Sequence, residues 1–334
     1  MNIYYGIIIF LSLIYLLIPQ NFLKLKDKNP HQKFTTDHIP PAIGGYFLIL
    51  TLFFNNQIDL IQKFLFFLIF LSGTLSDFKI LNSPTFRLTF QTFIILIFTN
   101  ISNLHLENTK IIFLDNLLEN SYFNLFFCYF CIIILVNGTN FIDGLNGLVL
   151  GYYAIIVFIL HYTGISSEVA SYKFITLLIF VLVLMLVLNL FNKIYVGDSG
   201  SYLIGFFMSF YLITVYLYNQ NLSPFFIILL IWYPCFEILF SIFRKYKLSV
   251  SPFSPDNSHL HQLLFKYLSK KISFKKNYIN NFSSVLILFY NFLIILISLN
   301  DISNTKFQVL LIIINIFVYI TLYFFIKKKL LMFR

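Results

Sequence analysis

Long stretches of apolar residues without charge follow one another along this chain. Residues 174–191, for example, contain only Leu, Val, Ile, Phe, Met, Thr and Asn. Hydrophobic residues make up 59% of the 334 and charged residues 11%, whereas soluble domains carry about 25% charged residues. These values exclude a water-soluble globule and a disordered chain, and the unbroken runs do not alternate as in a membrane β-barrel. The predicted fold class is an all-α, polytopic membrane helix bundle.

A membrane-crossing helix needs about 20 mainly apolar residues, and about 11 such segments are expected here. They lie near residues 3–18, 42–56, 60–76, 88–103, 121–138, 147–163, 172–191, 201–218, 224–242, 281–299 and 307–326. The first lacks a basic leader and a cleavage site, so it is expected to be a retained span. Residues 1–334 are predicted to form one membrane-embedded domain.

The distribution of basic residues predicts the orientation in the membrane. If the N-terminus faces outward, all but four of the 23 Lys and Arg residues fall on the inner side, which is typical of cytoplasmic loops. Residues 243–280 form the most basic of these predicted loops. An odd number of spans then places the C-terminus inside. The net charge of +10 is explained by this pattern, and nucleic-acid binding is not expected.

Three predicted inner loops carry aspartates at the ends of apolar spans. In GTLSDFKILNSPTFRLTFQ, residues 73–91, Asp77 ends one span and Arg87 begins the next. In NGTNFIDGLNGL, residues 137–148, Asn137, Asn140 and Asp143 are spaced three apart, so they form a stripe on one side of a helix. A carboxylate beside hydrocarbon usually has a partner, a metal or a chemical role. The alternatives are a surface ion pair for the first motif and a polar turn for the second.

The third aspartate, Asp198, lies in GDSGSYLIGF, residues 197–206, directly before a span. The carboxylate and amide oxygens of these loops suit Mg²⁺ or sugar hydroxyls, and Mg²⁺ can neutralise a diphosphate for in-line displacement. A nucleophilic role for Ser199 is not expected. His259 and His261 form an HxH pair in the basic loop and could contact a diphosphate or transfer a proton. The alternative is a histidine pair without a role.

The order of these motifs resembles the polyprenyl-phosphate N-acetylhexosamine-1-phosphate transferases. The resemblance runs from PAIGG (41–45) to SPDNSHLHQLL (254–264) and includes NxxNxxDGxxGL, GDxGSxxxGF and a Pro–acid segment in which Glu237 is the acid. The HxH pair is closer to the GlcNAc-type branch of this family than to its peptidoglycan branch. The resemblance implies a bacterial inner-membrane protein with its active site at the cytoplasmic face and a homodimer as one expected assembly.

The resemblance also implies an Mg²⁺-dependent enzyme, with Mn²⁺ as an alternative cofactor. Its partners would be a UDP-N-acetylhexosamine, a polyprenyl phosphate and the lipid bilayer, and the product would initiate a cell-envelope glycan. The implied catalytic residues are Asp77, Asp143 and Asp198, and the implied metal ligands are Asp198, Asn140 and Asp77. The implied substrate-binding residues are Asn137, Asn140, Arg87, His259 and His261.

Two departures and one alternative remain at this point. Ser76 and Asn146 stand where the family often has aspartate, which puts a mechanism with two adjacent carboxylates in question. The alternative function is a membrane transporter or flippase of lipid-linked sugars. Transporters place charged groups deep in broken helices, and Glu237 lies inside a span next to Trp232-Tyr233-Pro234. A purely structural scaffold leaves the one-sided aspartates unexplained.

Overall fold

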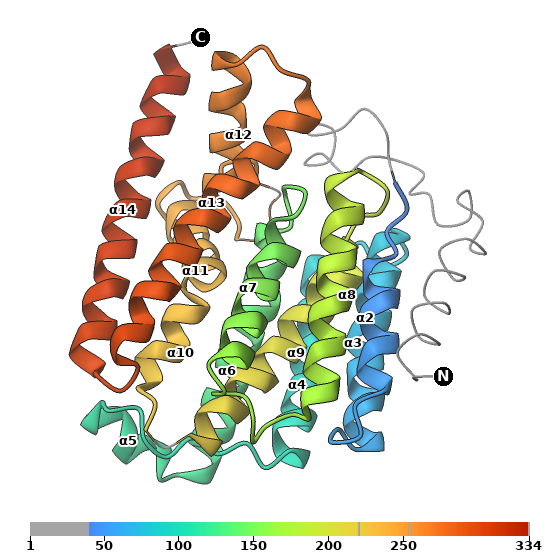
Figure 1. Cartoon of the computed structure of the whole chain (residues 1–334), viewed down its shortest axis with the longest axis vertical. Helices are drawn as coiled ribbons and strands as arrows, with labels where there is room; N and C mark the ends of the chain where they lie inside the picture. Colours follow the sequence, from blue (N-terminus) through green and yellow to red (C-terminus); the bar gives the residue numbers. More distant parts are fainter. Residues whose placement is uncertain (1–39, 220, 253, 255, 333–334) are drawn as a thin grey trace.

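The computed structural model describes residues 40–332 except 220, 253 and 255. In this part of the chain the regular structure is helical, apart from one isolated bridge between Ala42 and Tyr195. Figure 1 shows most of the helices running up and down side by side as a bundle. The elements are α2 (Gly44–Phe53), α3 (Leu60–Asp77), α4 (Pro84–Ile101), α5 (Ile112–Leu118), α6 (Ser121–Ile142), α7 (Leu148–Tyr162), α8 (Tyr172–Leu190), α9 (Gly197–Tyr218), α10 (Pro224–Leu230), α11 (Trp232–Lys247), α12 (Leu260–Lys271), α13 (Lys276–Ser298), η2 (Leu299–Asp301) and α14 (Thr305–Met332).

The described helices include enough long apolar ones for several membrane crossings. Six are long and apolar enough to span a bilayer: α3, α6, α8, α9, α13 together with η2, and α14. The pair α10 and α11 adds a seventh if it is one bent span, while α2 and α7 are shorter apolar helices. The chain is therefore a multi-pass membrane protein. The predicted number of eleven stays a prediction, and the expected span 3–18 lies outside the described residues.

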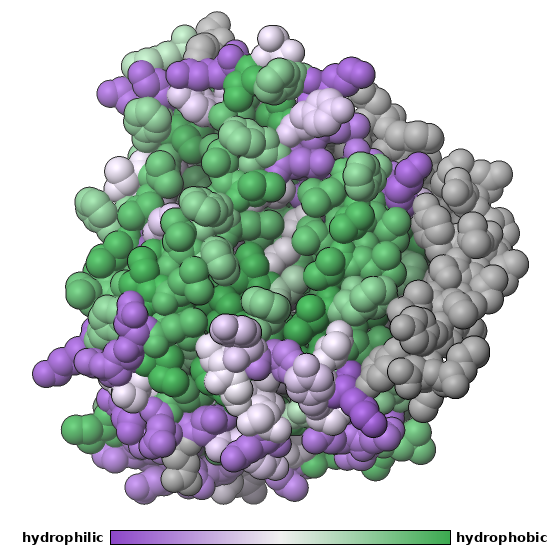
Figure 2. All heavy atoms as spheres, viewed as in Figure 1, coloured by the Kyte–Doolittle hydropathy of each residue, from purple (hydrophilic) through white to green (hydrophobic). Residues whose placement is uncertain are grey.

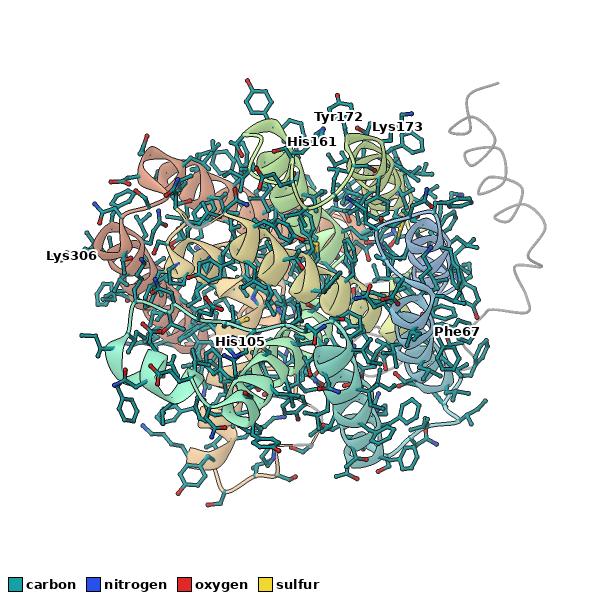
Figure 3. The ribbon with its side chains drawn as sticks, turned by 90° about the horizontal axis from the view of Figure 1, so that it is seen from below. Phe67, His105, His161, Tyr172, Lys173 and Lys306 are labelled. Carbon is teal, nitrogen blue, oxygen red and sulfur yellow. The ribbon has the colours of Figure 1, made fainter. Side chains whose placement is uncertain are left out.

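The surface agrees with this assignment. Figure 2 shows a broad band of hydrophobic residues between hydrophilic residues at the two ends of the bundle. Large apolar side chains such as Phe93, Phe289 and Phe317 are exposed, as expected for side chains that face lipid. Figure 3 views the lower end, where Lys173 and Lys306 are labelled. Charged residues therefore mark the ends of the helices.

Helix α9 is the most buried of the candidate spans and packs against α2, α3 and α6. Its neighbours approach closely because glycine lies at the crossing points. A Cβ on Gly73 of α3 would come within 2.4 Å of the Ser199 Cα, and one on Gly205 would come within 2.9 Å of the Val136 Cα. Small residues allow such close helix packing in membranes. This packing brings the N-terminus of α9 next to the end of α3.

The predicted span 224–242 is broken, as Trp232-Tyr233-Pro234 suggested. Helices α10 and α11 meet at Ile231 with a bend of 75°. Pro234 lacks the N–H that would bond to the carbonyl of Leu230. The hydroxyl of Tyr152 donates to that carbonyl instead, at 2.8 Å. The break directs α11 toward the end of the bundle that carries α12 (Figure 1).

The predicted basic loop, residues 243–280, is largely helical. Helix α11 continues to Lys247, α12 follows, and α13 begins at Lys276. The described residues between α11 and α12 are not helical, and His259 is the last residue before α12. The first turn of α12 therefore positions the histidine pair, whereas the sequence placed it in a loop.

Candidate active site

Asp198 is the centre of a polar cluster at one end of the bundle. It lies in the first turn of α9. Its Oδ2 accepts hydrogen bonds from Arg87 Nη1 at 3.0 Å and from Ser76 Oγ at 2.5 Å. Its Oδ1 accepts from Asn140 Nδ2 at 2.9 Å. The ends of α3 and α6 and the starts of α4 and α9 therefore meet at one carboxylate, as the sequence predicted.

Asp77 stabilises the start of α9. Its two carboxylate oxygens accept the backbone N–H groups of Asp198 at 2.8 Å and Ser199 at 3.0 Å. The first N–H groups of a helix have no partner within the helix, and the positive end of the helix dipole favours an anion there. Gly197, with φ +73°, makes the turn, and a Cβ at this position would lie 2.8 Å from Asp77 Oδ2. The contact between Asp77 and the start of α9 thus requires Gly197, the first glycine of the GDSG motif.

The PAIGG segment forms backbone hydrogen bonds with Tyr195, just before that turn. The backbone N–H of Tyr195 donates to the carbonyl of Pro41 at 2.9 Å, and that of Gly44 donates to the carbonyl of Tyr195 at 3.1 Å. A Cβ on Gly45 would come within 2.8 Å of Ser199. The motif therefore serves as a backbone support for the start of α9.

The two predicted asparagines have different surroundings. Besides its bond to Asp198, Asn140 Nδ2 donates to Ser201 Oγ at 2.9 Å, so both N–H bonds of this amide are used on α9. Asn137 Nδ2 donates to the Ile133 carbonyl at 3.0 Å and to Gln91 Oε1 at 3.4 Å. Asn140 thus belongs to the cluster, whereas Asn137 connects α6 to α4 next to it.

Asp143 lies just past the end of α6 and is part of the same charged neighbourhood. Within the described residues its carboxylate accepts no hydrogen bond. Burial raises the pKa of Asp143 well above the usual carboxyl range, and the charges of Asp198 and Asp77 raise it further. The three predicted aspartates are therefore close enough to repel one another, with Arg87 as the cation bonded to the cluster.

The histidine pair lies against the same end of α6. His259 and His261 stand at the start of α12, and their rings stack with centroids 5.6 Å apart. The ring of Phe141 meets His259 edge-on at 5.2 Å. A Cβ on Gly144 would come within 2.4 Å of His261 Nε2. The HxH and NxxNxxDG motifs, far apart in the sequence, are thus in direct contact.

Two interactions at the site were not foreseen from the sequence. Glu237 Oε1 lies 2.9 Å from His259 Nδ1, although an acid within an apolar span next to a proline gave a signal. Ser76, which replaces an expected aspartate, bonds to Asp198 and accepts from Arg87 Nη1. The serine therefore keeps a polar contact at a place where a carboxylate would add negative charge.

Asn146, the other departure, belongs to a buried amide network. Its Nδ2 donates to Asn192 Oδ1, and its backbone N–H donates to Asn280 Oδ1 at 2.8 Å. The neighbouring Gly147 N–H donates to Asn189 Oδ1. An aspartate at position 146 would have no N–H to donate to Asn192 Oδ1. The substitution is thus explained by local hydrogen bonding.

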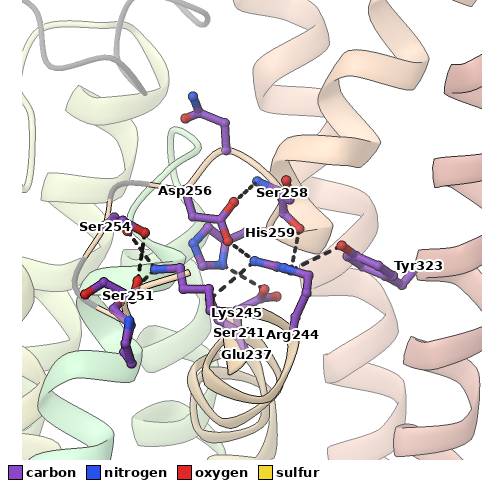
Figure 4. Close-up of polar contacts among 12 residues, drawn as sticks. Glu237, Ser241, Arg244, Lys245, Ser251, Ser254, Asp256, Ser258, His259 and Tyr323 are labelled. Atoms are coloured by element: carbon purple, nitrogen blue, oxygen red, sulfur yellow. Dashed lines mark hydrogen bonds and ion pairs between the residues drawn. The ribbon is translucent and has the colours of Figure 1, made fainter. Parts of the chain in front are cut away.

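The basic residues of α11 hold the loop before the histidines (Figure 4). Arg244 is buried and donates to the Ser258 carbonyl at 2.8 Å, to Tyr323 and to Asp256. Lys245 Nζ donates to the carbonyls of Pro252 and Ser254 at 2.8 and 2.7 Å. These cations are therefore structural and fix the chain at Pro252, Ser254, Asp256 and Ser258.

The fold and the polar cluster are those of a helical membrane protein with a one-sided acidic site. Residues 60–216 match the model of glycosyl transferase family 4. The matched segment contains the three aspartate motifs and ends before the histidine pair. The resemblance predicted from the motifs is thereby confirmed.

The similar curated proteins are undecaprenyl-phosphate alpha-N-acetylglucosaminyl 1-phosphate transferases. The one from Escherichia coli O157:H7 is 28% identical over 192 residues, which is 55% of this chain and 52% of the relative. The one from Yersinia pestis is 30% identical over 39% of this chain and 38% of the relative. The one from Thermotoga maritima is 27% identical over 41% of each. The chain spans about half the length of the Escherichia coli relative.

Proposed function

We propose that this protein transfers an N-acetylhexosamine 1-phosphate from a UDP-sugar to a polyprenyl phosphate and releases UMP. The observation that carries the proposal is the convergence of Asp77, Asp143 and Asp198 with Arg87 and Asn140 at one end of an apolar bundle. One substrate of such a reaction is water-soluble and the other is held in the bilayer, so the chemistry needs a polar site at the membrane surface. The curated relatives carry the name of this activity. The site would face the cytoplasm of a bacterial inner membrane.

The proposal includes a divalent cation held by carboxylate and amide oxygens, although the described residues contain no group of three or more His, Cys, Asp or Glu side chains already arranged to hold one. Asp143 has carboxylates as its charged neighbours and no hydrogen-bond donor among the described residues. Asn140 uses both amide N–H bonds as donors, which leaves its oxygen for a cation. Such oxygens are the ligands that Mg²⁺ prefers. Asp198, Asp77 and Asn140 would hold Mg²⁺ or Mn²⁺ with Asp143 beside them, and the bound ion would neutralise the diphosphate of the donor.

The side chains themselves suggest how the substrates bind. The guanidinium of Arg87 is half-buried, and its Nε has no partner among the described residues. Arginine matches phosphate oxygens bidentately, so Arg87 would anchor the phosphate of the polyprenyl acceptor. A phosphate oxygen of this acceptor would attack the β-phosphorus of the UDP-sugar, and UMP would leave. His259 and His261 would contact the donor diphosphate or sugar from the other side of Asp143.

The deep carboxylate that suggested a transporter has a local partner. Glu237 is hydrogen-bonded to His259, which belongs to the proposed site. Within the described residues, the burial of Glu237 is therefore explained without a transport role. UMP formation distinguishes the two functions, because a transporter or flippase leaves the UDP-sugar intact.

The test is UMP release by the full chain, purified in detergent with UDP-GlcNAc, a short polyprenyl phosphate and Mg²⁺. Asp198→Asn should lower the turnover number at least a thousandfold while the protein remains inserted and monodisperse. Asp59→Asn is the matched control, because Asp59 caps the opposite end of the helix that carries Asp77 and Asn also caps helices. Absence of UMP from wild type with a panel of UDP-sugars, or full turnover by Asp198→Asn, would exclude the proposal.

A further inference from the structure

Glu237 is fully buried on α11, with an exposed fraction of 0%. Placing a charge in such surroundings costs several kcal/mol unless the charge is paired and hydrogen-bonded. Among the described residues the hydrogen bond of its Oε1 is with His259. The family match ends at residue 216, so it covers neither residue. The pair therefore calls for an explanation of its own.

If Glu237 is ionised, the geometry of the pair assigns the position of one proton. Glu237 Oε1 lies 2.9 Å from His259 Nδ1, and a carboxylate can only accept a hydrogen bond. Nδ1 of His259 must therefore carry the proton. The second ring nitrogen, Nε2, is then the one left to interact elsewhere. A carboxylate behind a histidine commonly orients the ring and sets its tautomer in this way.

The orientation of His259 affects the site through ring contacts. Its ring stacks on His261 with an interplanar angle of 12°, and Phe141 contacts it edge-on. His261 is buried and rests against Gly144, the residue after Asp143. A rotation of His259 would thus disturb the end of α6 that carries the unpaired carboxylate.

Helix α11 contacts His259 and the loop before it from two positions along its length. Glu237 contacts the His259 ring, and about two turns further along the same helix Arg244 and Lys245 donate to carbonyls of the loop before His259. Figure 4 shows these contacts converging on one end of the helix. The loop contacts set where His259 lies, whereas the Glu237 contact sets how its ring is turned.

We propose that Glu237 is a positioning residue that holds His259 in the Nδ1–H tautomer and so orients the histidine pair toward the donor diphosphate. This inference rests on the proposed function for its catalytic consequence. Glu237 itself would touch neither substrate. Removing its charge should therefore act through His259 and lower kcat more than it changes the KM for the polyprenyl phosphate.

A double-mutant cycle tests this dependence. Glu237→Gln should lower kcat roughly tenfold or more, because the carboxylate that orients the His259 ring is lost, and Glu237→Asp should restore part of the loss. In a His259→Asn background, Glu237→Gln should change kcat less than twofold. Glu168→Gln is the matched control, because Glu168 is exposed near the opposite end of the bundle. Equal losses in the two backgrounds would overturn the proposal.

A spectroscopic measurement separates this inference from the proposed function. The full chain, labelled with ¹⁵N-histidine in detergent, reports the protonation of both ring nitrogens, and His259→Asn assigns the signal of His259. The wild type should show the Nδ1–H tautomer and Glu237→Gln a mixture. An unchanged pattern would overturn the positioning role even in an active enzyme. A changed pattern in a protein that releases no UMP would support the role and reject the proposed reaction.

Discussion

Asp143 differs from the other two aspartates at the residue scale, because its side chain lacks a donor among the described residues. Its raised pKa means that the folded chain binds this proton more tightly than the unfolded chain. The free energy of unfolding then falls as pH rises from the usual carboxyl range through the raised pKa. A residue that costs stability at neutral pH is typical of a functional site.

Asp143→Asn should therefore raise the apparent melting temperature of the metal-free protein at pH 7 by a few degrees. The same substitution should have little effect at pH 4, where the wild-type carboxyl is protonated, and should abolish UMP release. Thermal unfolding in detergent at the two pH values, with EDTA present, measures the effect. A lower melting temperature for Asp143→Asn at pH 7 would mean that the carboxylate has a stabilising partner.

Arg87 gives a prediction about the lipid substrate. Lysine can keep a charge near Asp198 but cannot present the planar fork that binds phosphate. Arg87→Lys should raise the KM for polyprenyl phosphate roughly tenfold and leave the KM for the UDP-sugar within about twofold. Lys193→Arg, an exposed residue at the same end, serves as the control. A selective rise in the KM of the UDP-sugar would assign Arg87 to the other substrate.

The sequence predicted which residues meet but not how they bond. Asp198, Asp77 and Asn140 lie together because each ends or begins an apolar helix on the same side. The role of Asp77 as a cap of α9 depends on a backbone approach that needs the tertiary structure. The pairing of Glu237 with His259 also joins two elements whose distance is set by the bend before α11, and spacing in the sequence does not encode that distance.

The glycines at helix crossings matter at the scale of the element. Gly73→Ala would place a Cβ 2.4 Å from the Ser199 Cα, which is backbone and cannot move aside. Separating α3 from α9 should cost about 1–3 kcal/mol and lower kcat, because Asp77 bonds across this contact. Gly151→Ala is the control, since its Cβ would meet the flexible end of Leu288. Apparent melting temperature and UMP release measure both. Equal effects of the two substitutions would argue against close α3–α9 contact.

Hydrophobic runs predicted the elements well where helices are long. The expected spans 121–138, 172–191 and 201–218 coincide with α6, α8 and α9. The polar extensions were harder to predict, because the first turn of α9 and the last turn of α6 contain Gly, Asn, Ser and Asp. Contacts between helices stabilise these turns, so an apolar pattern ends before the helix does.

The whole molecule makes a topological prediction. The site lies at the end of the bundle that carries Asn192 and Lys270, whereas Glu107 and Glu168 lie at the other end. Single cysteines at these four exposed or half-exposed positions, introduced into a chain whose three native cysteines are replaced by serine, should react with a membrane-impermeant reagent from opposite sides. Positions 192 and 270 should label from the cytoplasm only. Labelling of both pairs from one side would contradict the membrane assignment.

The packing around α9 has a consequence for how the protein is made. The helices that surround its first turn, α2, α3, α4 and α6, all precede it in the chain. When residue 218 emerges from the ribosome, the nascent chain therefore already contains the three aspartates and every helix that holds them. The histidines and the glutamate that contacts them are synthesised later and complete a site whose acidic half can assemble first.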